Sequence, residues 1–221
     1  STIALASLLA LAIVARVVQS ARGRPLLRRW IQSLAKEWSG TMLARSRWSR
    51  PAFRFQIAGE PLLFESLRID REDGLQLSTP WPDHAPCLLA CSKATHDAVG
   101  AEALDNVDVS AFSAELRSEH FIFRGNEQQA LARYVRSPVG WRLEQLYQSP
   151  IVSDVELIVR DGTLLVRKAG PFQAASQVGE FLEQAIALRE AFQLAQTAGI
   201  EFTGSTTGPH ADRAKCPVCS E

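Results

Sequence analysis

Two cysteines near the end of the chain, Cys216 and Cys219, have the spacing best suited to chemistry. Two thiolates separated by two residues can bind one zinc ion through a tight turn, which makes half of a tetrahedral site. We expect the other half to come from a second Cys-x-x-Cys pair beyond Glu221. A redox dithiol is one alternative, but the sequence lacks the thioredoxin-like strand and helix that would precede it. A tail without metal, or one completed by another chain, is the remaining interpretation.

The other polar residues form no recognisable catalytic motif. The four histidines, at positions 84, 96, 120 and 210, are scattered along the chain. His96 and Asp97, close to Cys91 and Ser92, are the one group that could be read as a hydrolase site, and ordinary loop residues explain them better. The sequence contains no G-x-S-x-G element, P-loop or dinucleotide fingerprint. We therefore predict that the protein is not an enzyme.

The chain begins with an apolar segment of a different kind. No charge interrupts the residues from Ile3 to Ala15, and Val17 and Val18 extend the run past Arg16. A helix that crosses a bilayer needs about 20 mostly apolar residues, so this segment is at the short end of the range. A secretory signal would place its positive charge before the apolar core, and a buried core helix would not need the arginines that follow. We predict a transmembrane anchor over residues 1–21.

The basic residues after this segment set its predicted orientation. Residues 1–54 hold ten Lys/Arg and one acid, a net charge of +9, and the rest of the chain holds 14 basic and 23 acidic residues, a net charge of −9. Basic residues mark the cytoplasmic side of a span, and they are attracted to anionic lipid. We therefore predict the inner (cytoplasmic) membrane as location, with the rest of the chain on the cytoplasmic side. Lipid is the expected partner rather than nucleic acid, which the acidic remainder would repel.

Residues 22–51 are predicted to be a basic amphipathic juxtamembrane helix and linker. From Pro25 to Trp38 apolar residues recur at helical spacing, with basic residues on the other side. Such a helix lies in the membrane interface or docks on its own domain, and the pattern does not choose between these. The residues expected to contact lipid are Arg16, Arg22, Arg24, Arg28, Arg29, Trp30 and Trp38.

Residues 52–199 are predicted to form an α+β domain. Alternating residues indicate strands over 52–58, 62–69 and 120–124, and a further strand over residues 74–77. Asp161-Gly162 is a two-residue loop typical of a type I′ hairpin, which would pair Val159 with Leu164. A long helix over about 173–198, ending at Gly199, carries one wide apolar stripe. Residues 200–221 are predicted to be a flexible tail.

The order of these parts resembles that of a loose group of uncharacterised bacterial single-pass membrane proteins. The matching pieces are Phe121-Ile-Phe-Arg-Gly125, residues 159–166, the final helix and the cysteine pair. The resemblance implies a strand-rich cytoplasmic domain and a C-terminal zinc-ribbon-like tail, but no reaction.

The expected fold is therefore one N-terminal transmembrane helix, followed by a soluble α+β domain whose antiparallel sheet is covered by a long C-terminal helix. The expected function is that of a non-catalytic accessory or scaffold subunit docking on a larger membrane protein complex, such as a photosynthetic or respiratory assembly. The alternative is a membrane-tethered signalling adaptor that recruits a cytosolic partner through the zinc-ribbon-like tail.

Overall fold

An antiparallel sheet is the centre of the fold. A computed structural model of the chain describes residues 25–43, 49–69, 72–82, 88–92, 105–107, 120–125, 134 and 138–204. In these ranges nine strands form one sheet in the order β1-β2-β3-β4-β9-β8-β5-β7-β6. The strands are β1 (Thr41–Met42), β2 (Ala52–Ile57), β3 (Glu60–Ile69), β4 (Glu72–Pro80), β5 (Leu88–Ser92), β6 (Asp105–Val107), β7 (Phe121–Gly125), β8 (Val155–Arg160) and β9 (Thr163–Ala169).

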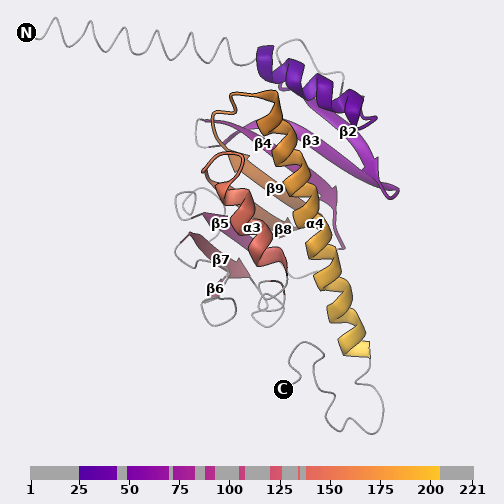
Figure 1. The fold of residues 1–221 in the computed structure, drawn as a ribbon. Coiled ribbons are helices and arrows are strands. Elements are labelled where there is room, and N and C mark those ends of the chain that lie inside the picture. The colour runs from indigo at the N-terminus through magenta and orange to yellow at the C-terminus, as the bar shows by residue number, and fades with distance from the viewer. Residues whose placement is uncertain are drawn as a thin grey trace, which may run out of the picture.

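Helices cover one face of this sheet. Helix α4 (Ala175–Gly204) runs diagonally across the strands, and α3 (Pro138–Gln148) lies beside it (Figure 1). A further helix over residues 25–37 lies at the top of the molecule, next to the first turns of α4. The α+β class, the antiparallel sheet and the covering C-terminal helix predicted from the sequence are thus confirmed.

Apolar and polar side chains alternate along β2, and the apolar ones lie on the face of the sheet that the helices cover. Phe53 and Phe55 are buried, whereas Arg54 and Gln56 are exposed. The Phe53 ring lies 5.4 Å from that of Phe64 on β3, which in turn lies 6.1 Å from that of Phe181 on α4. These aromatic contacts join two strands and a helix, and burial of such large side chains contributes much of the packing energy.

The β8–β9 hairpin has the register predicted from its turn. Asp161 and Gly162 both have positive φ, 49° and 67°, as a type I′ turn requires. Val159 pairs with Leu164, and Glu156 pairs with Arg167. Because turn type fixes hairpin register, this part of the fold could be predicted from local sequence.

Two predicted boundaries were wrong. The turn before β3 is formed by Ala58 and Gly59, with φ of 51° and 85°, so Glu60 already belongs to the strand. Helix α4 does not end at Gly199 but continues to Gly204. Glycine in a helix interior costs about 1 kcal/mol relative to alanine, so it weakens a helix without ending it unless it adopts positive φ.

Several predictions concern segments outside the described residues. These are the apolar span before Pro25, the loop residues around His96 and the cysteine tail. Of the helices in the described ranges, none combines the length and the apolar character needed to cross a membrane.

Candidate functional site

The helix over residues 25–37 belongs to the folded domain. Its inward-facing side chains are buried: Ile31 is fully buried and Leu34 is 7% exposed. Leu34 lies close to Gly179 on α4, and β1, just after the helix, pairs with β2. The sequence left two alternatives for this helix, in the membrane interface or docked on its own domain. The buried side chains and the contact with α4 show that it is docked on the domain. Leu27, Ile31, Leu34 and Ala35 belong to the same hydrophobic core as the strands and α4.

The residues predicted to contact lipid have different environments in the structure. Arg16, Arg22 and Arg24 lie outside the described residues. Arg29 is exposed and Arg28 is half-buried, whereas Trp30 and Trp38 are partly buried against the domain's core. The Trp38 ring meets that of Phe55 edge-on at 5.6 Å. The basic side of the helix is thus at the protein surface, whereas its two tryptophans pack against the core.

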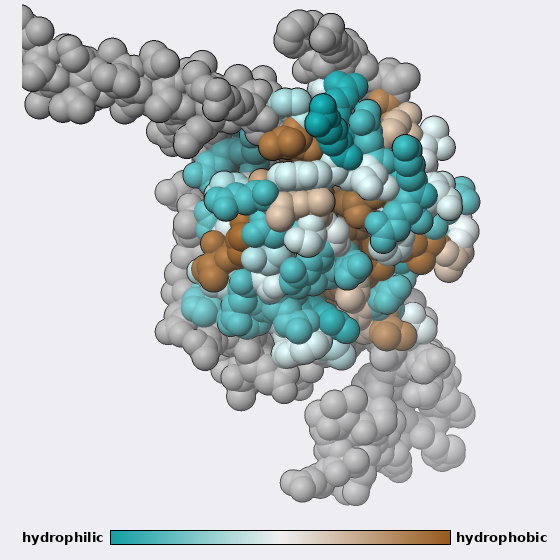
Figure 2. Space-filling model, turned by 45° about the horizontal axis from the view of Figure 1, so that its top comes forward, coloured by the Kyte–Doolittle hydropathy of each residue, from teal (hydrophilic) through white to brown (hydrophobic). Residues whose placement is uncertain are grey.

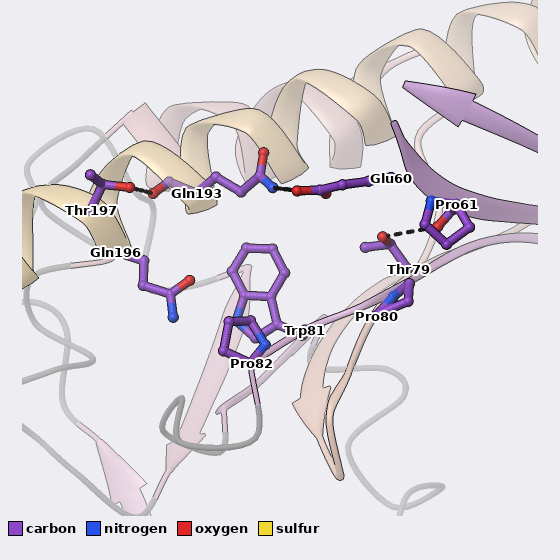
Figure 3. Close-up of a pocket in the computed structure, with 9 residues that line it drawn as sticks. All are labelled: Glu60, Pro61, Thr79, Pro80, Trp81, Pro82, Gln193, Gln196 and Thr197. Atoms are coloured by element: carbon purple, nitrogen blue, oxygen red, sulfur yellow. Dashed lines mark hydrogen bonds between the residues drawn. The ribbon is translucent and has the colours of Figure 1, made fainter. Parts of the chain in front are cut away.

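A hollow of about 580 Å³ lies at the other half of α4, where the helix passes over the ends of β3 and β4. We call it the α4 notch. Figure 3 shows its lining residues, which come from the start of β3, the end of β4 and the outer turns of α4. They are Glu60, Pro61, Thr79, Pro80, Trp81, Pro82, Gln193, Gln196 and Thr197.

An ion pair between a buried arginine and a half-exposed glutamate forms one wall of the α4 notch. The Glu60 carboxylate accepts a hydrogen bond from the Arg189 guanidinium, and the Gln193 amide donates to the same carboxylate at 3.1 and 3.3 Å. Arg189 is only 3% exposed, and burial lowers the pKa of its guanidinium, while the Glu190 carboxylate opposes that shift. The negative charge of Glu60 is therefore already neutralised by groups of the protein.

Trp81 forms the floor of the α4 notch. It is 5% exposed, packs edge-on against Phe192 at 5.5 Å, and its backbone N–H donates to the Gly162 carbonyl at 2.7 Å. Its indole nitrogen, on the side of the ring that faces Gln196 in Figure 3, has no acceptor among the described residues, and neither has Nε of Arg189. A buried donor without an acceptor costs about 1–3 kcal/mol, so a ligand that supplied a carbonyl would gain affinity here.

The lining of the α4 notch is suited to binding. Among the nine lining residues there is no histidine, cysteine or lysine, and the one carboxylate is held by Arg189 and Gln193. Amide and hydroxyl groups stand next to three prolines and an indole, which offers donors and acceptors without net charge. This combination fits an uncharged polar ligand such as an extended peptide backbone.

A second polar cluster lies around the end of α3. His120 Nδ1 is 2.8 Å from Glu144 Oε1, and the His120 ring stacks on Tyr147 at 4.8 Å. Nearby, the fully buried Lys168 donates hydrogen bonds to the carbonyls of Leu146 and Tyr147. The lysine thus satisfies backbone acceptors that the helix leaves open at its C-terminus, which is a structural role.

Burial lowers the pKa of Lys168 from 10.5 to about 7, because the charged ammonium is costly away from water. The carboxylates of Glu180 and Asp154 act in the opposite direction.

The predicted metal site lies outside the part of the chain that the structure describes, since Cys216 and Cys219 both follow Gly204. In the described ranges no three His, Cys, Asp or Glu side chains are grouped so that they could hold a metal ion.

Sequence reasoning missed the α4 notch. Trp81 lies between two prolines, Pro80 and Pro82, and this local pattern does not indicate a pocket. The available signal was Arg189, a charged residue flanked by apolar helix positions, which has to find a partner when the helix is buried.

Comparison with known proteins gives one similarity of fold. No family model matches the chain, and no curated protein matches it. Among solved structures, it is similar to the crystal structure of the mycobacterial trehalose monomycolate transport factor A, TtfA. The TM-score is 0.48 and the identity 13%, over 76% of this chain and 93% of that chain.

Proposed function

We propose that this protein is a non-catalytic, membrane-anchored accessory subunit that docks on a larger membrane protein complex from the cytoplasmic side. The anchor is the apolar segment within residues 1–21, and the docking part is the α+β domain. An energy-converting complex, photosynthetic or respiratory, is the type of host we propose.

The observation that carries this proposal is the burial of Ile31 and Leu34. It makes the helix over residues 25–37 part of the rigid domain. The proposed span ends at about residue 21, so three residues separate it from that helix. The domain would therefore be held at the headgroup layer in a restricted orientation, as a subunit that contacts a neighbouring membrane protein needs to be.

The α4 notch is the proposed docking place for a segment of the partner. Gly179, which adjoins Leu34, and Gln193 in the notch are 14 residues apart on α4. At 1.5 Å per residue the notch lies about 21 Å along the helix axis from the membrane-proximal helix. A partner that reaches it would need an extended cytoplasmic loop or terminus, which agrees with the uncharged polar lining.

Filling the α4 notch is expected to weaken partner binding. Gln196→Trp places an indole in the hollow, and loss of a central contact in an interface typically costs 2 kcal/mol or more, so the amount of co-purified partner should fall at least about tenfold. The measurement is affinity purification of the full chain from membranes in mild detergent, with co-purified proteins quantified by mass spectrometry.

Gln56→Trp is the matched control, because Gln56 is an exposed glutamine on β2 that does not line the notch. This variant should recover as much partner as the unchanged chain does. A chain that purifies from membranes as a monomer with no membrane protein would contradict the proposed function. Equal recovery with Gln196→Trp would remove the α4 notch from it.

A membrane-tethered signalling adaptor is the second candidate, favoured by the Cys216–Cys219 spacing. Here the tail would recruit a cytosolic protein through a zinc-ribbon-like module. It predicts one zinc ion per chain in the natural full-length protein, lost on Cys216→Ser together with Cys219→Ser. Elemental analysis of the purified protein measures this, and a protein without zinc would remove the basis for the adaptor.

A further inference from the structure

A second hollow lies between the outer side of the helix over residues 25–37 and strand β1. It measures about 520 Å³, and we call it the β1 groove. Figure 2, which turns this end of the molecule forward, shows mostly hydrophilic side chains there, interrupted by smaller apolar areas. The lining residues are Arg29, Gln32, Ser33, Ala35, Lys36, Gly40 and Met42.

The β1 groove has positive charge without a compensating acid. Arg29 and Lys36 are both exposed, and among the described residues neither forms an ion pair with a carboxylate. They are seven residues apart, about 10.5 Å along a helix axis, so they lie on one side of the helix. Gln32 and Ser33 lie between them and offer hydrogen-bond donors. Two long cationic side chains can converge on one anion between them.

The geometry points to the β1 groove as a binding site for the phosphate of an anionic lipid headgroup. This rests on the proposed function, because a body held within a few residues of the span brings this helix to headgroup level. Arginine forms paired hydrogen bonds with phosphate, lysine adds a point charge, and the Met42 side chain gives the groove an apolar side for the glycerol region. The surrounding charge agrees, since Glu37 is the one acid within residues 1–54.

The test uses the full chain in phosphatidylcholine vesicles that contain phosphatidylglycerol with a photoactivatable headgroup. After illumination, the labelled residues are mapped by mass spectrometry. The unchanged chain should carry label within residues 29–42. Arg29→Gln with Lys36→Gln should reduce that label about tenfold or more, the loss expected for two cations near an anionic surface.

Arg68→Gln with Arg160→Gln is the control, because these two exposed arginines lie on β3 and β8 and their removal changes the net charge equally. It should leave the label within residues 29–42 unchanged. Undiminished label in the Arg29/Lys36 variant, or an equal fall in the control, would overturn the inference. Loss of the label on adding millimolar inorganic phosphate would overturn it too, since free phosphate would then be the ligand. Partner recovery measured on the same variants separates these outcomes from failure of the proposed function.

Discussion

A chain that begins at Pro25 should be absent from the carbonate-washed membrane pellet and should keep its fold. The unchanged chain should remain in the pellet after an alkaline carbonate wash, because each leucine, isoleucine or valine in a span contributes about 0.3–0.6 kcal/mol to insertion. The shortened chain retains the contacts described above, from Ile31 on the first helix to Phe192 on α4. Its thermal unfolding, followed by circular dichroism, should change by a few degrees at most.

Ile31→Ala in the full chain is the complementary variant. The side chain is fully buried, and such truncations cost about 2–5 kcal/mol of unfolding free energy. This variant should be less stable but should stay in the membrane pellet, so it separates loss of packing from loss of the anchor. Retention of the shortened chain in the carbonate-washed pellet would mean that the apolar segment is not the anchor.

Stability should increase between about pH 7 and pH 10 through Lys168. Its pKa is about 7 in the folded protein and 10.5 when the side chain is in water. In this window the unfolded chain binds a proton that the folded chain does not, so unfolding takes up a proton and becomes harder as pH rises. The slope from this one group is at most about 1.4 kcal/mol per pH unit.

The measurement is the free energy of unfolding in urea at several pH values, compared with Lys168→Met. The variant keeps a flexible side chain of similar size and removes the titrating amine. The unchanged chain should therefore become more stable relative to the variant as pH rises. All other titratable groups are present in both proteins, so their contributions cancel in the comparison. A difference that is constant with pH would show that Lys168 is protonated in the folded state.

Local sequence predicted those parts of the fold that local interactions determine. The Asp161-Gly162 turn fixed the β8–β9 register, and alternation identified β2 and β3. The place of this hairpin in the sheet could not be predicted. β9 pairs with β4 and β8 with β5, so the hairpin lies between strands that precede it by more than 60 residues. Such pairing depends on the packing of the whole sheet, about which periodicity carries no information.

The two candidate sites differ in the same way: one is formed by neighbouring residues of the chain, and the other by residues far apart in sequence. The basic side of the helix over residues 25–37 could be predicted from the sequence. Arg29 and Lys36 are seven residues apart, about two helical turns, so they lie on the same side. The α4 notch was not visible, because Trp81 and Gln193 are 112 positions apart and Glu60 is paired with Arg189 from a third segment. Only the structure brings β3, β4 and α4 together at that point.

The central claim, that the domain docks on another membrane protein, is tested most directly by photo-cross-linking in intact membranes. A benzophenone amino acid replaces Thr197 in the α4 notch, and in a second chain it replaces Gln56 outside it. We expect one main cross-linked product from position 197, identified by mass spectrometry as an integral membrane protein, and little of it from position 56. A membrane-retained chain that gives no product from position 197, or the same products from both positions, would contradict it.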